Sequence, residues 1–130
     1  MEEFDIAIIG GGPAGIMAAI AASADLNIVL LEKNSSLGSK LLITGGGRCN
    51  ITNEKPIKKL LNSFHDKNFL KHSFYTFTNE MLLDLFRNRG LDFIVEDNNR
   101  VFPETEKSQD ILAILKYYLK AVSYTHLRAH

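Results

Sequence analysis

The sequence predicts an α/β fold, and three features near its N-terminus carry that prediction. A short apolar run at residues 4–9 has the length and composition of a buried strand. The alanine-rich segment at 16–22 is built from strong helix formers. Between them, residues 10–15 have the spacing G-x-G-x-x-G, which is typical of a tight link from a strand into a helix.

Each glycine of this turn has a separate role in the prediction. Gly10 permits the sharp turn, Gly12 leaves space for a pyrophosphate to approach the backbone, and Gly15 lets the helix pack closely against the strand. Pro13 is tolerated near the first helical position because its missing N–H would have no helical partner. The free N–H groups of the first turn, together with the helix dipole, form a positive pole suited to phosphate.

A second apolar run, residues 28–31, ends at Glu32 and completes a strand–helix–strand unit. The acid follows the first glycine by about twenty residues, the spacing of a carboxylate that accepts hydrogen bonds from a ribose 2′-hydroxyl. The alternative is an ordinary glycine turn with Glu32 as a surface charge. Strand, helix, strand and acid in this order favour dinucleotide binding, and they leave NAD and FAD both open because both use the same turn.

A second glycine-rich stretch occupies residues 43–53 and contains three consecutive glycines followed by Arg48. Consecutive glycine N–H groups can line an anion-binding nest, and arginine adds a fork of donors that matches phosphate. The alternative is a flexible linker with an exposed arginine. The short polar side chains of Thr44 and Asn50 on either side favour an ordered loop, because such side chains bond to local backbone.

The remainder of the chain alternates helices with one predicted hairpin. The predicted helices cover 57–64, 69–74, 79–88 and 108–119, and the predicted hairpin pairs 93–96 with 100–102. We expect Thr78 or Asn79 to cap the third of these helices, Ser108 to cap the last, and residues 97–99 to form a turn that accepts positive φ.

Composition limits the classes of function. The chain has 130 residues, 45% of them hydrophobic, with 15 basic and 15 acidic side chains, so we expect one globular domain or less, with neither a nucleic acid nor a membrane as partner. A small-molecule substrate is the expected partner, and the oligomeric state stays open. A single cysteine and the lack of a membrane-spanning run favour a cytoplasmic protein. His65 and His72 are expected to be solvated, and no metal-ligand spacing is present.

The two glycine-rich stretches resemble one family in particular. Residues 10–15, Glu32 with Lys33, and above all residues 40–53 are similar to the bacterial FAD-dependent oxidoreductases that include enzymes named aminoacetone oxidase and bile-acid dienoyl reductase. Residues 100–103 with Lys107 match the same family. The resemblance covers residues 1 to about 121. It implies a Rossmann-like FAD-binding domain that a second domain interrupts in the complete protein.

The resemblance also implies a function and a set of site residues. The function is hydride transfer between FAD and NAD(P)H or an organic substrate. The alternatives are a dinucleotide-binding module without turnover, or a truncated chain that binds nothing. No catalytic residue and no metal ligand is assigned. The implied cofactor-binding residues are Gly10, Gly12, Ala14, Gly15, Glu32, Lys33, Lys40, Thr44, Gly45, Gly46, Gly47, Arg48, Cys49 and Asn50.

Cys49 has two interpretations. It could be a redox-active thiol beside the flavin, with its pKa lowered by Arg48. It could instead be a small buried packing residue in a tight loop, and we favour this because the chain has no second cysteine to pair with it.

The last residues, 122–130, depart from the family and resemble one reading frame of a transposon-end adapter used in preparing sequencing libraries. We therefore predict that residues 1–121 are the N-terminal part of the FAD-binding domain and that 122–130 are a non-native tail. The domain would then hold two parallel strands and a hairpin, truncated before its sheet is complete. Parallel sheets need cover on both faces and usually more strands, so we expect an unstable piece.

Overall fold

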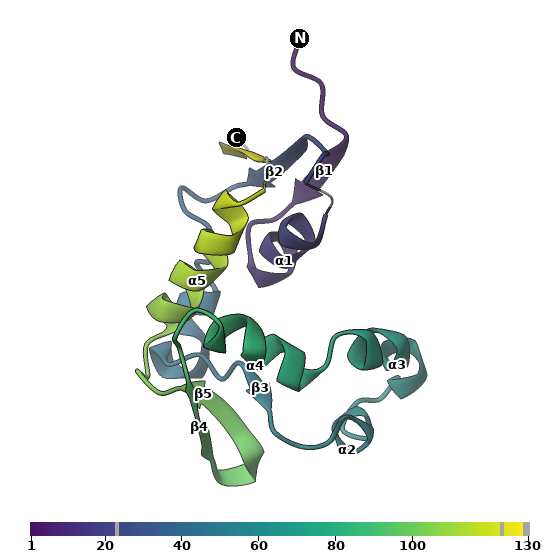
Figure 1. The fold of residues 1–130 in the computed structure, drawn as a ribbon, viewed down its shortest axis with the longest axis vertical. Helices are drawn as coiled ribbons and strands as arrows, with labels where there is room; N and C mark the ends of the chain where they lie inside the picture. The colour runs from purple at the N-terminus through teal and green to yellow at the C-terminus, as the bar shows by residue number, and fades with distance from the viewer. Residues whose placement is uncertain (23, 123, 129–130) are drawn as a thin grey trace.

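A computed structural model describes residues 1–22, 24–122 and 124–128 (Figure 1). The helices and strands alternate along the chain as an α/β fold requires. In order they are β1 (Ile6–Ile9), α1 (Pro13–Ala21), β2 (Ile28–Glu32), the 3-10 helix η1 (Leu41–Gly47), β3 (Thr52–Asn53), α2 (Ile57–Leu61), α3 (Lys67–Thr76), α4 (Asn79–Arg87), β4 (Phe93–Glu96), the 3-10 turn η2 (Asp97–Asn99), β5 (Arg100–Pro103), α5 (Ser108–Lys120) and β6 (Tyr124–Arg128).

The predicted strand–helix–strand unit is present. β1 and β2 are parallel neighbours, with Ile6 opposite Ile28 and Ile9 opposite Leu31, and α1 connects them. Ile28, Val29 and Leu30 of β2 are buried, as expected for a central strand of a parallel sheet. α1 and α5 lie side by side against this sheet (Figure 1). The core between them is formed by apolar side chains that include Ile16, Leu30, Phe86, Ile111 and Leu119.

A third parallel strand corrects the expectation of only two. β6 pairs with the free edge of β2, placing His126 opposite Leu30, and the sheet order is β1-β2-β6. β2 is buried, so its unpaired N–H and C=O groups need partners on both sides, and the tail supplies them. The proposed non-native origin of residues 122–130 stays a prediction. Residues 123, 129 and 130 lie outside the described part of the chain.

The second sheet is antiparallel, in the order β3-β5-β4, and it contains the predicted hairpin. Asn98 and Asn99 have φ of 63° and 59°, which confirms the expected positive-φ turn. β3 was not predicted. Its two residues pair with Val101 and Arg100, and so short a strand leaves no alternating pattern in the sequence.

The helix ends are set by local hydrogen bonds, and one predicted cap is wrong. Thr78 caps α4, since its side-chain oxygen accepts a hydrogen bond from the N–H of Met81 at 3.2 Å. Ser108 does not cap α5, because it is the first helical residue and Lys107 is at the cap. The Ser108 hydroxyl instead donates to the carbonyl of Leu42 at 2.9 Å, tying α5 to η1.

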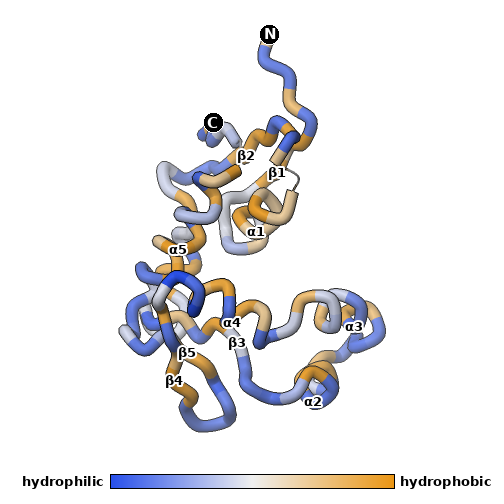
Figure 2. Tube along the Cα trace, viewed as in Figure 1, coloured by the Kyte–Doolittle hydropathy of each residue, from blue (hydrophilic) through white to orange (hydrophobic). Residues whose placement is uncertain are grey.

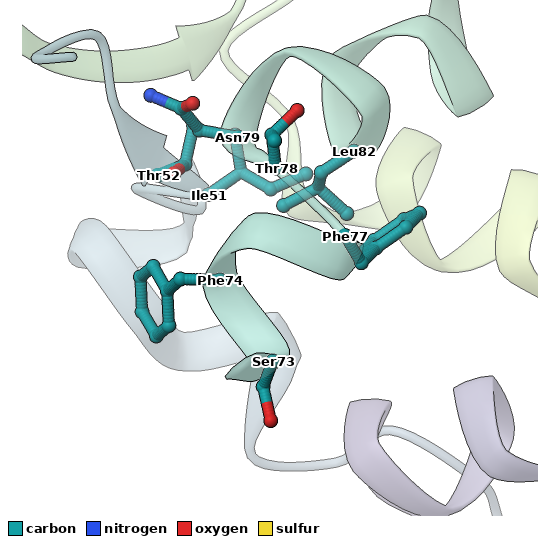
Figure 3. A pocket seen from close by; sticks show the side chains of 8 residues that line it. All are labelled: Ile51, Thr52, Ser73, Phe74, Phe77, Thr78, Asn79 and Leu82. Atoms are coloured by element: carbon teal, nitrogen blue, oxygen red, sulfur yellow. The ribbon is translucent and has the colours of Figure 1, made fainter. Parts of the chain in front are cut away.

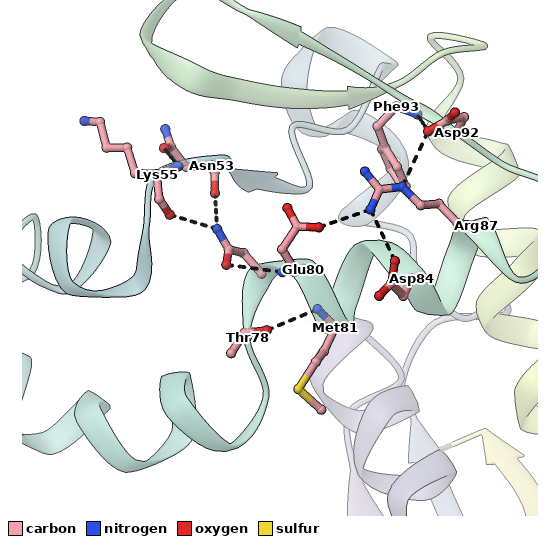
Figure 4. Close-up of polar contacts among 10 residues, drawn as sticks. Asn53, Lys55, Thr78, Glu80, Met81, Asp84, Arg87, Asp92 and Phe93 are labelled. Carbon is pink, nitrogen blue, oxygen red and sulfur yellow. Dashed lines mark hydrogen bonds and ion pairs between the residues drawn. The ribbon is translucent and has the colours of Figure 1, made fainter.

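Side-chain contacts also fix α4 to its neighbours (Figure 4). The Asn79 amide donates to the carbonyls of Asn53 and Lys55, at 2.7 and 3.0 Å, which anchors the start of α4 on the end of β3 and on the segment that follows it. At the other end, Arg87 forms ion pairs with Glu80 and Asp84 on the surface of the same helix.

α2 and α3 form an arm that projects away from the parallel sheet and connects to it through α4 (Figure 1). No residue of α3 is buried. His65 and His72 are exposed on this arm, as predicted. No helix in the described residues is long and apolar enough to span a membrane, and those residues contain no cluster of side chains that could hold a metal ion.

Candidate dinucleotide-binding site

The first glycine turn has the geometry that its sequence predicts. Gly10 has φ of 99°, and its N–H donates to the carbonyl of Leu31 at 2.8 Å, which links the turn to the end of β2. A Cβ at Gly15 would overlap the carbonyl oxygen of Gly10, so only glycine allows α1 to approach this closely. A Cβ at Gly12 would meet no protein atom within 4 Å. The space beside Gly12 is therefore open to a ligand.

The start of α1 adds unpaired backbone donors to this open space. Gly12 is the N-cap and has no side-chain cap, and Pro13 occupies the first helical position. The N–H groups of Ala14 and Gly15 have no partner inside the helix. Together with the helix dipole they form a positive pole beside Gly12, as predicted for a pyrophosphate site.

Glu32 lies at the carboxyl end of β2 and is buried, with 8% of its surface exposed. One carboxylate oxygen accepts a hydrogen bond from the N–H of Gly11 at 2.7 Å. The other accepts from the backbone N–H and the side-chain amide of Asn34, at 2.8 and 2.9 Å. The N–H groups of Asn34 and Gly11 hold the pKa of the Glu32 carboxyl below its usual value. Glu32 is thus an ionised group that fastens the glycine turn to β2, and its contact with a ribose stays a prediction.

These residues surround a hollow of about 450 Å³ at the carboxyl ends of β1 and β2. Ligands of open α/β sheets bind at this end, and the volume is typical of a small-molecule site. Two lysines, Lys33 and Lys40, line it and are exposed. The structure therefore brings together Gly10, Gly12, Glu32, Lys33 and Lys40 of the predicted set.

Sequence reasoning missed several residues that shape this hollow. A Cβ at Gly11 would collide with the side chain of Leu37, and the Gly11 carbonyl accepts a hydrogen bond from the N–H of Gly38 at 2.8 Å. The loop after β2 therefore folds back over the turn. The glycine at position 38 was the available signal, because glycine is favoured where a tight turn needs a positive φ, and Gly38 has φ of 73°.

The second glycine stretch is an ordered loop, as predicted. Gly45, Gly46 and Gly47 all have positive φ, between 57° and 88°. The Thr44 hydroxyl donates to the carbonyl of Leu41 at 2.7 Å, and the N–H of Cys49 donates back to the carbonyl of Thr44 at 3.0 Å. Residues 44–50 are not among those that line the 450 Å³ hollow, so their contact with a cofactor stays a prediction.

Arg48 is held in ion pairs with carboxylates of the same chain. Its guanidinium forms ion pairs with Glu96 at 2.6 Å and Glu106 at 2.9 Å, and it lies 4.1 Å from the centre of the Phe102 ring. The hydrogen bonds that Arg48 donates to the carboxylates of Glu96 and Glu106 raise its pKa. In this arrangement Arg48 fastens the glycine loop to the hairpin of β4 and β5. An added phosphate would have to compete with two carboxylates for it.

Cys49 matches the packing interpretation. It is 2% exposed and has φ of 62°, and it lies against an apolar pocket that Met17, Phe86 and Ile111 also line. Burial raises the pKa of the thiol, which is the opposite of the depressed pKa that a reactive cysteine beside Arg48 would require.

The lowered pKa of Glu32 predicts an acid-dependent loss of stability. The folded pKa lies below the unfolded value of about 4.3, so Glu32 contributes stability above that pH and loses it as the pH falls through the folded pKa. We expect Glu32→Gln to lower the thermal midpoint of the flavin-free protein at pH 7 and to have progressively less effect below pH of about 4. Glu104→Gln, at an exposed position, should leave the thermal midpoint unchanged both at pH 7 and in acid. An equal effect of Glu32→Gln at every pH would contradict the assignment.

The turn, the open helix start and the acid at the end of β2 define a dinucleotide-binding domain of the Rossmann class. The chain matches the family described as HI0933-like protein Rossmann domain over residues 4–129. It therefore belongs to the HI0933-like family, whose Rossmann domain is the FAD-binding domain of flavoprotein oxidoreductases.

Relatives of known name match most of the chain, and one solved structure shares its fold. The chain is 34% identical to a 3-dehydro-bile acid delta(4,6)-reductase of Clostridium scindens, covering 95% of the chain and 31% of that protein. It is 33% identical to the ribosomal RNA dihydrouridine synthase of Escherichia coli, covering 88% of the chain and 28% of that protein. The fold resembles the crystal structure of Thermovibrio ammonificans THI4, with a TM-score of 0.61, 15% identity, and coverage of 96% of this chain and 38% of that one. The chain thus spans about a third of the length of these relatives.

Proposed function

We propose that the protein is an FAD-dependent oxidoreductase that transfers a hydride between the flavin and NAD(P)H or an organic substrate. The observation that carries this proposal is the open space at Gly12, bounded by the first turn of α1 and by the fixed carboxylate of Glu32. Because the relatives are about three times as long, the proposal concerns the complete protein and assigns its substrate contacts to other parts. A cytoplasmic location is part of the proposal.

The residues present fit the cofactor. The pyrophosphate would lie over Gly12 and the N–H groups of Ala14 and Gly15, where a Cβ at Gly12 would fill the space. The adenosine ribose would hydrogen-bond to Glu32, because the carboxylate oxygen that accepts from Gly11 has a second lone pair free. Lys33 and Lys40 would add positive charge at the rim. FAD supplies the hydride chemistry when bound, and these residues bind and orient it.

The names of the relatives support reduction as the reaction. One is called a reductase of a 3-dehydro-bile acid, and the other a synthase of dihydrouridine in ribosomal RNA. Both names describe the addition of hydrogen to an unsaturated ring. We extend to this protein the class of reaction, reduction of an organic substrate at the expense of NAD(P)H, and leave the substrate to be found by screening.

An absorbance spectrum of the complete protein, purified without added cofactor, tests this proposal. We expect the two visible bands of oxidised flavin, and we expect them to bleach when NADH or NADPH is added without oxygen. Bands that persist with both reductants and with every substrate screened would favour the alternative, a dinucleotide-binding module without turnover. A colourless protein that fails to take up added FAD would contradict the proposal.

A further inference from the structure

The arm formed by residues 54–76, which contains α2 and α3, carries an excess of positive charge. It has five lysines and two acids, a net charge of +3 in a chain whose total is zero, and two histidines in addition. Figure 2 shows the hydrophilic segment that joins the two helices at the end of the arm. The whole-chain balance, on which the expectation of no nucleic-acid partner rested, hides this local excess.

The lysines of the arm are not neutralised within the described part of the chain. Arg48, Arg87 and Arg100 all form ion pairs with acids of the chain. No ion pair in the described residues involves a lysine of the arm. Lys58, Lys59, Lys67 and Lys71 are exposed. Their charge is therefore available to an external anion.

Two adjoining hollows run along the exposed side of α3. Their volumes are about 360 and 510 Å³, and both are lined by Asn68, Lys71 and Tyr75. The first is also lined by Lys58 and Lys67, so that three lysines border it. Asn68 and Tyr75 thus add an amide and an aromatic ring beside the positive charges.

Aromatic exposure distinguishes this surface from an ordinary solvated charge cluster. Tyr75, which lines both hollows, is 52% exposed; Phe69 is 80% exposed but lies on another face of α3. Neither ring takes part in an aromatic or cation–π contact in the described residues. Phe74 and Phe77, in contrast, line a separate apolar hollow of about 360 Å³ between α3 and α4 (Figure 3).

We propose that this arm binds a single-stranded polynucleotide. Lysine side chains attract its phosphates, exposed aromatic rings stack on its bases, and amides hydrogen-bond to base edges or sugars. Lys67 and Lys71 lie one helical turn apart, with Tyr75 one turn further, so charge and ring follow one line along α3. A lipid surface fits less well, because Asn68 and His72 interrupt any apolar stripe on this side of the helix.

This proposal goes beyond the flavoenzyme function and is independent of it. The arm shares no residue with the hollow at Gly12 and Glu32, and no step of the binding requires the cofactor. Flavin content, read by absorbance, therefore reports on the first proposal, while polynucleotide affinity reports on the second. Either can fail while the other holds.

Fluorescence anisotropy of a labelled, mixed-sequence single-stranded RNA of about 20 nucleotides tests the proposal, with the complete protein as titrant at several salt concentrations. We expect Lys67→Glu with Lys71→Glu to weaken binding about tenfold or more and to reduce the slope of log K against log salt by about 1.4. The matched control reverses the charge of two exposed lysines elsewhere, Lys107 and Lys120, and should have little effect on RNA affinity or its salt dependence. The thermal midpoint of each variant confirms that it is folded.

A second variant separates base stacking from general attraction of a polyanion. Tyr75→Ala should weaken RNA binding about fivefold or more, whereas Tyr75→Phe should retain it, because both Tyr and Phe present a ring. The same titration with single-stranded DNA identifies which polynucleotide is preferred, and either result supports the proposal. Three results would overturn the proposal. The Lys67/Lys71 variant and the Lys107/Lys120 control could lose RNA affinity equally. The protein could bind RNA no more tightly than it binds polyglutamate, or it could bind only to phosphatidylserine vesicles.

Discussion

Replacing Gly15 by alanine is expected to abolish FAD binding and to destabilise the strand–helix–strand unit. The new methyl group would overlap the carbonyl oxygen of Gly10, which is main chain and cannot rotate away. Moving α1 outward would relieve the overlap but would separate Ile16 and Ala19 from the core, where both are completely buried. Overpacking of this kind costs about 1–3 kcal/mol, and displacement of the turn removes the cofactor site as well. Thermal unfolding and flavin absorbance of the purified variant measure both effects.

Gly12→Ala is the matched control, since it adds the same methyl group at a position of the turn where no protein atom obstructs it. Gly12 has φ of −78°, which alanine adopts without strain, and its Cβ would meet no protein atom. We expect the flavin-free protein to keep its thermal midpoint and to lose affinity for FAD, because the methyl group fills the space that the pyrophosphate needs. Unchanged FAD affinity in Gly12→Ala would contradict the location of the site.

The parts of this fold that were predictable from sequence are those specified by residues close together in the chain. The first unit follows from the spacing of Gly10, Gly12 and Gly15 between two apolar runs, and the strands that it pairs lie within about thirty residues of each other. The hairpin follows from its asparagine turn, and the start of α4 follows from Thr78. In each case a local backbone requirement selects a particular residue type.

The features that were missed depend on contacts between distant residues. The sequence shows Arg48 beside three glycines, which suggests phosphate, but the fold places Glu96 and Glu106 next to it from 48 and 58 residues away. Ser108 has the residue type of a cap, yet its partner is the carbonyl of Leu42, 66 residues earlier. β6 was missed because its pairing depends on the unpaired edge of β2 and not on its own pattern. Electrostatic and hydrogen-bond partners of this kind require the topology first.

Truncation of Phe102 is expected to have a large effect on stability, because this ring joins the hairpin of β4 and β5 to the glycine loop. Phe102 is 1% exposed in β5, Arg48 lies over its face, and its edge packs against Gly45 of the glycine loop. Phe102→Ala would leave a cavity beneath Arg48 and should cost about 3–5 kcal/mol in the free energy of unfolding. Urea denaturation of the complete, flavin-free protein measures this loss through the midpoint of the transition.

Two further variants assign the effect to its cause. Phe69→Ala removes the same ring from a position that is 80% exposed and should change stability by no more than about 0.5 kcal/mol. Phe102→Leu keeps most of the buried volume but removes the face on which Arg48 lies, so it should cost less than Phe102→Ala and loosen the glycine loop selectively. Faster hydrogen exchange at Gly46 and Gly47 in Phe102→Leu would show that the ring holds the loop against the hairpin. Unchanged exchange there, with stability reduced elsewhere, would mean that Phe102 acts only as core volume.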